Sequence, residues 1–381
     1  MGNLKIYEQK TQYGPDDVGF IPEKIQVFDN HLMKLIDEKR LQGAGYLLSR
    51  DNKVFVHKSM GKLRWNDEKS EFVPDSIWNL ASITKLFTAT AILQLVENGH
   101  IRIDQPLMEL MDEFNHPLFN SITIFHLLTH TSDLCPDPGA YFEPYPARRN
   151  WYNKKNWIEG LLSGHTRVEP GKEWRYSSAG FTLLGEIVSR VSGTRYDEYV
   201  VENILKPLGM NDTFFEIPED KLSRACLSDG VTEEKMKKWM DEYRNRPDWA
   251  PPKAGGGLAS TLDDLQKFAN MIINKGQYNG NRILSRKTVE RMTRNQLKGV
   301  IDNCWENEGY EKAYGLGIKV QENNFLLTPG TVSHEGAGLS ALYIDPKEKF
   351  VFAMFGPLYK GVDWEARAIF NSLNIVWSGL E

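Results

Sequence analysis

Strand-like segments lie at both ends of this chain and enclose a helical middle, and this order restricts the fold more than any other feature. Near the start, apolar residues alternate with polar ones or form short runs in two segments, Ala44 to Ser49 and Lys53 to Lys58. A polar turn separates these segments. Near the end, segments 314–320, 338–344 and 350–355 have the same character. Strands at both ends predict an α+β fold, in which the two ends meet in one mainly antiparallel sheet.

Helical patterns fill the remainder of the chain. Residues 22–38 and 363–377 read as helices that cover the sheet. We therefore expect a discontinuous sheet domain, 1–80 plus 301–381, and a mostly helical lobe at 81–300. Within this lobe, residues 220–253 change to charged and proline-rich sequence. That segment is either an irregular, lid-like insertion or a solvated surface excursion, and the sequence does not separate the two.

Composition excludes several classes of function. The 381 residues carry a formal net charge of -5, which gives no basic footprint for nucleic acid. Cys135, Cys226 and Cys304 lie far apart, which argues against a disulfide framework or a structural zinc site. The N-terminus is too polar for a signal peptide, and no run is long enough to span a membrane. We expect a soluble cytoplasmic protein; a processed secreted form and the oligomeric state stay open.

Ser82 and Lys85 form a Ser-x-x-Lys sequence at the start of a predicted amphipathic helix, residues 86–98, that stops at Gly99. A spacing of three places the amine about one turn from the hydroxyl, on the same face. The free N–H groups of a helix start favour negative charge near Ser82, and a lysine with a lowered pKa can remove the serine proton. The alternative is that the Ser-x-x-Lys pattern occurs here by chance and that Ser82 is an N-cap, a position at which serine is common.

Two later stretches could complete a nucleophilic site. Tyr176-Ser-Ser178 lies between a turn and a helix, where a tyrosine could reach the nucleophile and a nearby lysine would stabilise its phenolate. The alternative is a capping aromatic followed by an N-cap serine. Residues 333–338 lead into a strand, and their small side chains permit close approach of backbone to a ligand. The alternative there is a glycine-rich turn before an edge strand.

Six motifs together resemble a known family. In chain order they are Asn79-Leu-Ala-Ser-Ile-Thr-Lys85, Ile122-Thr-Ile-Phe-His-Leu-Leu-Thr-His-Thr-Ser132, Glu169-Pro-Gly171, Tyr176-Ser-Ser178, Ala254-Gly-Gly-Gly-Leu-Ala-Ser260 and His334-Glu-Gly336. This order resembles serine hydrolases of the class C β-lactamase type, a group that also holds penicillin-binding proteins, D-aminopeptidases and family VIII-type carboxylesterases. The resemblance covers the chain from about residue 25 to the last helix and implies a β-lactamase/transpeptidase-like fold.

The resemblance implies roles for matching residues. Ser82 would be the acylated nucleophile with Lys85 as its partner, and Tyr176 would act with Lys85 as general base and then as acid. The N–H groups of Ser82 and Ala337 would bind the oxyanion. The expected substrate-binding residues are Ser178, His334, Gly336 and Ala337. Neither a metal nor a cofactor is expected.

The implied activity is hydrolysis of a small ester or amide, or of a short peptide, through an acyl-enzyme. Two departures favour an esterase or a (D-)peptidase over an efficient β-lactamase. Ser178 stands where those enzymes carry asparagine, and His334-Glu-Gly336 replaces Lys-Thr-Gly and removes a permanent cation. Whether Glu335 faces the site stays open. The alternatives are an acyltransferase and a slowly deacylating penicillin-binding or sensor protein.

Other signals have plainer interpretations. His126 and His130 have a metal-site spacing but no third ligand nearby, so a structural role is favoured. The glycines at 255–257 are expected to pack close to the cleft. Asp133 replaces the glycine usual in the second motif, and the sequence gives no reason. Packing is likewise favoured over a role in the cleft for three aromatic residues, Trp151, Tyr152 and Trp157.

Overall fold

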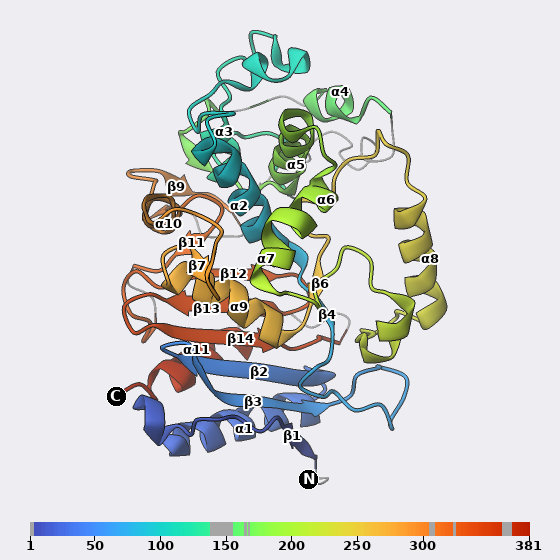
Figure 1. The fold of residues 1–381 in the computed structure, drawn as a ribbon, viewed down its shortest axis with the longest axis vertical. Helices are drawn as coiled ribbons and strands as arrows, with labels where there is room; N and C mark the ends of the chain where they lie inside the picture. The colour runs from blue at the N-terminus through green and yellow to red at the C-terminus, as the bar shows by residue number, and fades with distance from the viewer. Residues whose placement is uncertain are drawn as a thin grey trace.

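The two ends of the chain form one central sheet. A computed structural model describes residues 4–137, 155–163, 166, 168–304, 309–322, 325–359 and 368–381. Seven antiparallel strands lie in the order β1-β3-β2-β14-β13-β12-β11 (Figure 1). The predicted α+β class with a mainly antiparallel sheet is therefore confirmed.

The N-terminal strands are β1 (Ile6–Glu8), β2 (Gly43–Arg50) and β3 (Lys53–Gly61). A two-residue turn joins β2 to β3, as predicted. Both turn residues, Asp51 and Asn52, have positive φ, 50° and 63°. Aspartate and asparagine tolerate that conformation, and its twist matches the twist of a hairpin.

The C-terminal strands complete the sheet. They are β11 (Lys319–Val320), β12 (Val332–Gly336), β13 (Ser340–Asp345) and β14 (Phe350–Phe355). Strand β14 pairs with β2 along its whole length, which joins the two ends of the chain. Strand β12 pairs with β13 at all five residues and with β11 at only two.

Two predicted strands have the wrong bounds. Segment 314–320 contributes only β11, because Gly315 donates a backbone hydrogen bond to Ile318 at 2.7 Å and closes a turn there. The strand expected from Gly338 begins at Ser340, since Gly338 has φ 85° within the preceding turn. Glycine turns interrupt extended chain that the apolar pattern alone does not distinguish from strand.

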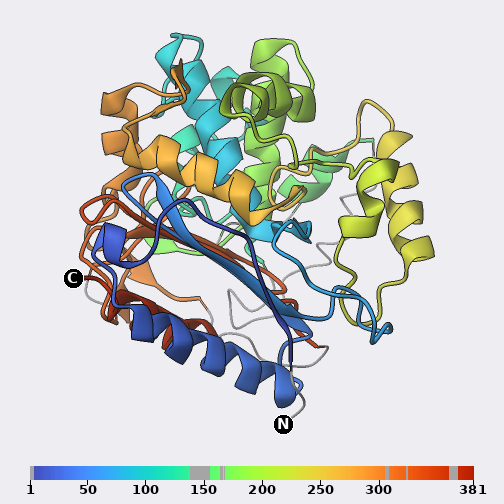
Figure 2. The same ribbon diagram turned by 60° about the horizontal axis from the view of Figure 1, so that its bottom comes forward.

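Helices cover both faces of the sheet. Helices α1 (Pro22–Asp37) and α11 (Ala368–Trp377) lie together on one face, as predicted, although residues 363–367 of the expected last helix lie outside the described residues. Helix α9 (Leu262–Ile273) packs against the other face, on β2, β13 and β14 (Figure 2). Neighbouring strand residues alternate between these two cores. The division into a sheet domain and a lobe at 81–300 remains a prediction.

Helix α2 (Thr84–Glu97) is the central helix of the lobe. It is not amphipathic as predicted, because it is buried on nearly every side: 11 of its 14 residues are buried. Gly99 follows its end with φ 74°, as expected of a helix stop. Around it lie α3 (Ile124–Leu128), α4 (Trp157–Leu162), α5 (Ser178–Ser192), α6 (Tyr196–Val200) and α7 (Lys206–Leu208).

Residues 220–253 are more regular than predicted. They contain α8 (Glu233–Arg244), whose start is capped by Thr232. In Figure 1 this helix stands at the side of the molecule, apart from the other helices of the lobe. The expectation of an irregular insertion is therefore wrong for this helix.

Short elements connect these parts. They are β4 (Trp78–Asn79), β5 (Glu173–Trp174), β6 (Ala259–Ser260), β7 (Gln277–Tyr278), β8 (Asn281–Arg282), α10 (Arg286–Thr293), β9 (Ile301–Asp302) and β10 (Tyr310–Glu311). Strand β4 pairs with β6 directly before the Ser82 turn. Within the described part of the chain, every helix is too short or too polar to cross a bilayer.

Candidate active site

Ser82 lies in a short 3-10 turn, Ala81–Ile83, that runs directly into α2. Ala81 has φ 43°, a backbone conformation that residues other than glycine rarely adopt. Its N–H donates to Asn79 Oδ1 at 2.9 Å. The turn is thus held in an unfavourable backbone conformation by its neighbours. It leaves Ser82 half-buried directly before α2. The residues that follow in this helix, Thr84 to Leu93, are all buried.

Lys85 is completely buried beside Ser82. Its Nζ lies 3.1 Å from Ser82 Oγ, 3.2 Å from Ser178 Oγ and 2.6 Å from the carbonyl oxygen of Gly255. Burial lowers the pKa of Lys85 from 10.5 to about 8, against the opposing effect of the Asp137 carboxylate. A substantial fraction of the amine is therefore neutral near pH 8 and able to accept a proton.

Tyr176 reaches the same point from the segment between β5 and α5. Its phenol forms a hydrogen bond with the Ser82 side chain, and Lys85 Nζ lies 4.8 Å from the centre of its ring. Burial raises the pKa of Tyr176 well above 10, and Tyr314 and Asp137 raise it further. The expected stabilisation of a phenolate by lysine is therefore not found. Tyr176 is a neutral phenol, and Lys85 is the group whose pKa is lowered towards neutral pH.

His334 lies on β12, on the face of the sheet turned towards the lobe. Its ring centre is 6.5 Å from that of Tyr176, and the side chain is buried. Burial, assisted by the charge of Lys85, lowers the pKa of His334 to about 4. The imidazole is therefore neutral at physiological pH, and no cation stands at this position.

Glu335 points to the opposite face of the sheet. Its carboxylate accepts a hydrogen bond from the Tyr343 hydroxyl and lies 3.8 Å from Lys319 Nζ. Burial alone would raise the pKa of Glu335, but Lys319 and the Tyr343 hydroxyl hold it below its usual range. The sequence left open whether Glu335 faces the site. The structure shows that its side chain lies on the face of the sheet opposite to His334.

Gly336 allows β12 to approach the Ser82 turn. A Cβ at this position would lie 2.2 Å from the carbonyl oxygen of Leu80 and 2.2 Å from Ser340 Oγ. No side chain fits in that space, so glycine is required on steric grounds. The next residue, Ala337, is exposed in the turn between β12 and β13.

Asp137 is a member of the site that the sequence did not reveal. Its Oδ1 accepts a hydrogen bond from the Ser178 N–H at 2.7 Å, and its Oδ2 accepts one from Ser178 Oγ at 2.6 Å. Its own N–H donates to the Tyr176 carbonyl at 2.8 Å. Ser178 therefore joins Lys85 to Asp137 instead of projecting freely towards a substrate.

Comparison with known proteins identifies the family. A family model described as Beta-lactamase matches residues 28–368. The chain belongs to the Beta-lactamase family. Protein Rv1367c of Mycobacterium tuberculosis (strain ATCC 25618 / H37Rv) is 30% identical over 287 residues, which cover 70% of this chain and 71% of that protein.

Other similar proteins have different described activities. A putative D-alanyl-D-alanine carboxypeptidase of Escherichia coli O157:H7 is 23% identical, over 91% of this chain and 85% of its own. The solved structure of EstCE1, described as a hydrolase with promiscuous acyltransferase activity, matches with a TM-score of 0.75 and 18% identity, over 93% of this chain and 98% of that one. The Beta-lactamase family thus fixes the fold and the serine hydrolase class, but no single substrate.

The other sequence signals of this Beta-lactamase family member are structural. His126 Nδ1 accepts the Thr123 N–H at 3.1 Å at the start of α3, and His130 Nδ1 accepts the Ser177 N–H at 3.1 Å. Nowhere in the described ranges do three or more histidine, cysteine or acidic residues gather as a metal site would require. Trp157 is buried in the core.

Two remaining sequence questions have different outcomes. Asp133 adopts φ 53°, a left-handed conformation that explains why glycine is usual there. Its carboxylate accepts the Val168 N–H and lies 3.4 Å from Arg175 Nη1, which ties down the loop. Trp151 and Tyr152 lie outside the described residues.

Proposed function

We propose that this protein is a serine hydrolase that cleaves an ester or amide bond through an acyl-enzyme on Ser82. The observation that carries the proposal is the buried amine of Lys85, 3.1 Å from Ser82 Oγ and with a pKa of about 8. A serine hydroxyl becomes a useful nucleophile when an adjacent base can take its proton. Membership of the Beta-lactamase family supports the same assignment.

Acylation uses both neighbours of the nucleophile. Neutral Lys85 takes the proton as Ser82 Oγ attacks the carbonyl carbon, and the N–H groups of Ser82 and Ala337 stabilise the oxyanion. Tyr176 carries its proton because its pKa is raised, so it can protonate the departing oxygen or nitrogen. A proton then passes from Lys85 to Tyr176, which restores both groups.

Deacylation reverses the order. Water attacks the acyl carbonyl, and the Tyr176–Lys85 pair removes its proton. The bond to Ser82 Oγ breaks, Ser82 regains a proton, and the free acid leaves. No step requires a group from outside the chain except substrate and water.

The charges around the site favour an esterase or a (D-)peptidase over an efficient β-lactamase. His334 is neutral, so it offers a hydrogen bond but no cation for the carboxylate of a β-lactam. Asp137 adds a negative charge next to Ser178 and repels such a carboxylate. The Escherichia coli relative's description as a putative carboxypeptidase keeps a peptide with a D-residue as the second substrate class.

An acyltransferase is the second candidate function. The described acyltransferase activity of EstCE1, whose fold this chain shares, favours it. In that reaction an alcohol or amine replaces water in the second step, with the same residues in the same roles.

Hydrolysis of p-nitrophenyl acetate tests the proposal. Sustained release of p-nitrophenol with a transient acetyl group on Ser82, detected by mass spectrometry, supports a hydrolase. A single burst indicates a slowly deacylating sensor, and faster release with added alcohol indicates an acyltransferase.

Two serine variants complete this test. Ser82→Ala should lower the rate by about 10⁴-fold or more with unchanged thermal unfolding. Ser163→Ala, at an exposed hydroxyl far along the chain, is the matched control. No release and no adduct in the wild-type protein would reject the proposal.

A further inference from the structure

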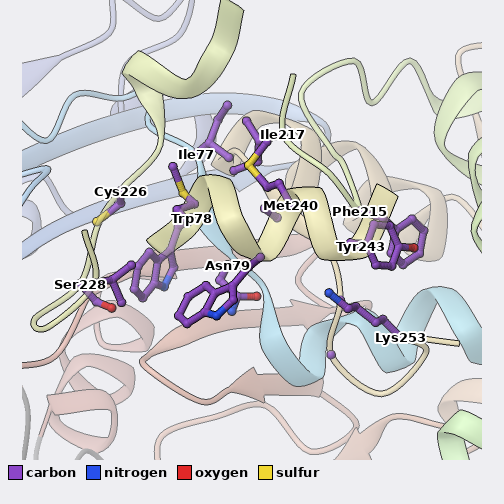
Figure 3. A pocket seen from close by; sticks show the side chains of 16 residues that line it. Ile77, Trp78, Asn79, Phe215, Ile217, Cys226, Ser228, Met240, Tyr243 and Lys253 are labelled. Carbon is purple, nitrogen blue, oxygen red and sulfur yellow. The ribbon is translucent and has the colours of Figure 1, made fainter. Parts of the chain in front are cut away.

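An apolar cavity of about 250 Å³ lies beneath α8 (Figure 3). Its walls come from β4, from the chain after Phe214 and from α8 itself. Nine of the sixteen described residues that line it have large apolar or aromatic side chains, among them Phe215, Ile217, Val231, Met236, Trp239 and Met240. Three polar side chains, those of Asn79, Ser228 and Lys253, also line it. The mechanism proposed above makes no use of this space.

The cavity shares a wall with the Ser82 site. Asn79 and Gly256 both line it. Asn79 Oδ1 holds the N–H of Ala81, the residue before the nucleophile. A Cβ on Gly256 would lie only 3.5 Å from the Ala81 carbonyl carbon, and the neighbouring Gly255 carbonyl accepts the Lys85 hydrogen bond. Two residues of the cavity wall, Asn79 and Gly256, therefore lie against the residue before the nucleophile, while Ser82 itself is not among the described residues that line the cavity.

Helix α8 forms the roof of the cavity with its apolar face. Four of its residues line the cavity and recur at spacings of three and four: Met236, Trp239, Met240 and Tyr243. Trp239 is nevertheless 45% exposed, so this face is not closed by protein packing. An apolar face left partly open beside a reactive site is typical of a ligand-binding surface.

Contacts at both ends fix α8 in place. At its start, Glu233 lies 2.8 Å from Arg64 Nη1, and Trp65 Nε1 donates to the Val231 carbonyl at 2.8 Å. At its end, Arg244 pairs with Glu216. The roof is therefore attached to the body on both sides of the opening, which keeps a defined cavity between them.

We propose that this cavity binds the acyl group of the substrate, as an apolar chain of medium length or an aromatic ring. The inference rests on the acyl-enzyme function proposed above. Tyr176, which protonates the leaving group, is not among the described residues that line the cavity, and neither is His334. The leaving group faces Tyr176, so the group that stays on Ser82 is directed the other way.

The volume sets the size of the acyl group. The cavity of about 250 Å³ equals about eight water-sized volumes of ~30 Å³ each. A methylene group is similar in size to a water molecule, so an acyl chain of about eight carbons fills the space. Each methylene that enters is expected to raise kcat/KM by about three- to fourfold until the cavity is full.

A series of p-nitrophenyl esters from acetate to dodecanoate tests this inference. We expect kcat/KM to rise with chain length, to be about 10³-fold higher for octanoate than for acetate, and to fall beyond about ten carbons. Met236→Trp places a larger side chain in the cavity and should lower the octanoate-to-acetate ratio by about tenfold or more. Met240→Ala enlarges the cavity and should move the optimum to longer chains.

The control is Lys238→Trp, which introduces the same side chain on the exposed side of α8 and should leave the ratio unchanged. Thermal unfolding identifies a variant that fails to fold, and in that case Met240→Ala decides. If the protein hydrolyses acetate but shows no preference for longer chains, or if both tryptophan variants change the ratio equally, the inference is wrong and the hydrolase proposal stands. If no ester reacts and Ser82 carries no adduct, both fail.

Discussion

The two sides of Ser82 are built in opposite ways. On one side, Lys85, Tyr176, Ser178 and Asp137 form a connected set of hydrogen bonds around a buried amine. On the other side, the cavity beneath α8 is mostly apolar, and the polar side chains in its lining are Asn79, Ser228 and Lys253. The difference separates two tasks: the polar side fixes protons and charges, and the apolar side selects by size.

This contrast has a consequence for tolerance to mutation. A polar network in a low-dielectric interior depends on each partner, since an unpaired buried group costs its full desolvation energy. An apolar wall adjusts its shape at lower cost. Variants on the polar side should therefore change the rate for every substrate, whereas variants beneath α8 should change the preference among substrates.

The largest expected effect on the polar side comes from Tyr176→Phe. Removing one hydroxyl takes away the proposed proton donor and should lower kcat by about 10²–10⁴-fold for acetate and octanoate alike. Thermal unfolding should change little, because the ring contacts remain. Tyr314→Phe is the matched control: this buried tyrosine of the same cluster has a hydroxyl with no hydrogen-bond partner among the described residues. Equal losses in both variants would contradict the proton-donor role.

A smaller but broad effect is expected from Gly336→Ala. The new Cβ would overlap the Leu80 carbonyl oxygen and push β12 away from the Ser82 turn. We expect about 10²-fold lower kcat/KM and about 1–3 kcal/mol lower stability, measured by ester hydrolysis and denaturant unfolding. Gly14→Ala, where the nearest atom is 3.7 Å away, should change neither. Wild-type behaviour of Gly336→Ala would show that the approach of β12 is not needed.

The smallest effect on rate, and the most specific, is expected from Asp137→Asn. The carboxylate raises the pKa of Lys85, so its removal should lower that pKa below about 8. The pH at which kcat/KM reaches half its maximum should then move down by up to about one unit. A midpoint that stays in place, or moves up, would exclude electrostatic contact between these groups. The ratio of octanoate to acetate should not change.

Much of this arrangement could be predicted from the sequence. The β2–β3 hairpin, the last strands and the positions of Ser82, Lys85 and Tyr176 depend on local periodicity, turn residues and short motifs, all of which are visible in the chain. The close approach at Gly336 also follows from residue type, since glycine before a strand permits it.

Other features depend on contacts between distant segments. Asp137 meets Ser178 across 41 residues, and no motif marks it. Helix α2 has an apolar pattern that suggests one buried face, but neighbouring elements bury it on nearly all sides. The direction of Glu335 was undetermined because a strand offers two faces, and only the pairing with Tyr343 decides between them. The sequence also did not indicate that α8 forms the roof of a cavity.

The pH dependence of Ser82 acylation is the most direct test of the central claim, that a buried and partly neutral Lys85 activates Ser82. Burial lowers the pKa of Lys85 to about 8, so its proton is lost as the pH rises through that value. The acylation rate of the wild-type protein, followed by the initial release of p-nitrophenol, should therefore rise about tenfold per pH unit below about 8 and level off above it. A rate that stays flat from about pH 6, or that rises only near the usual lysine value of about 10, would contradict the account.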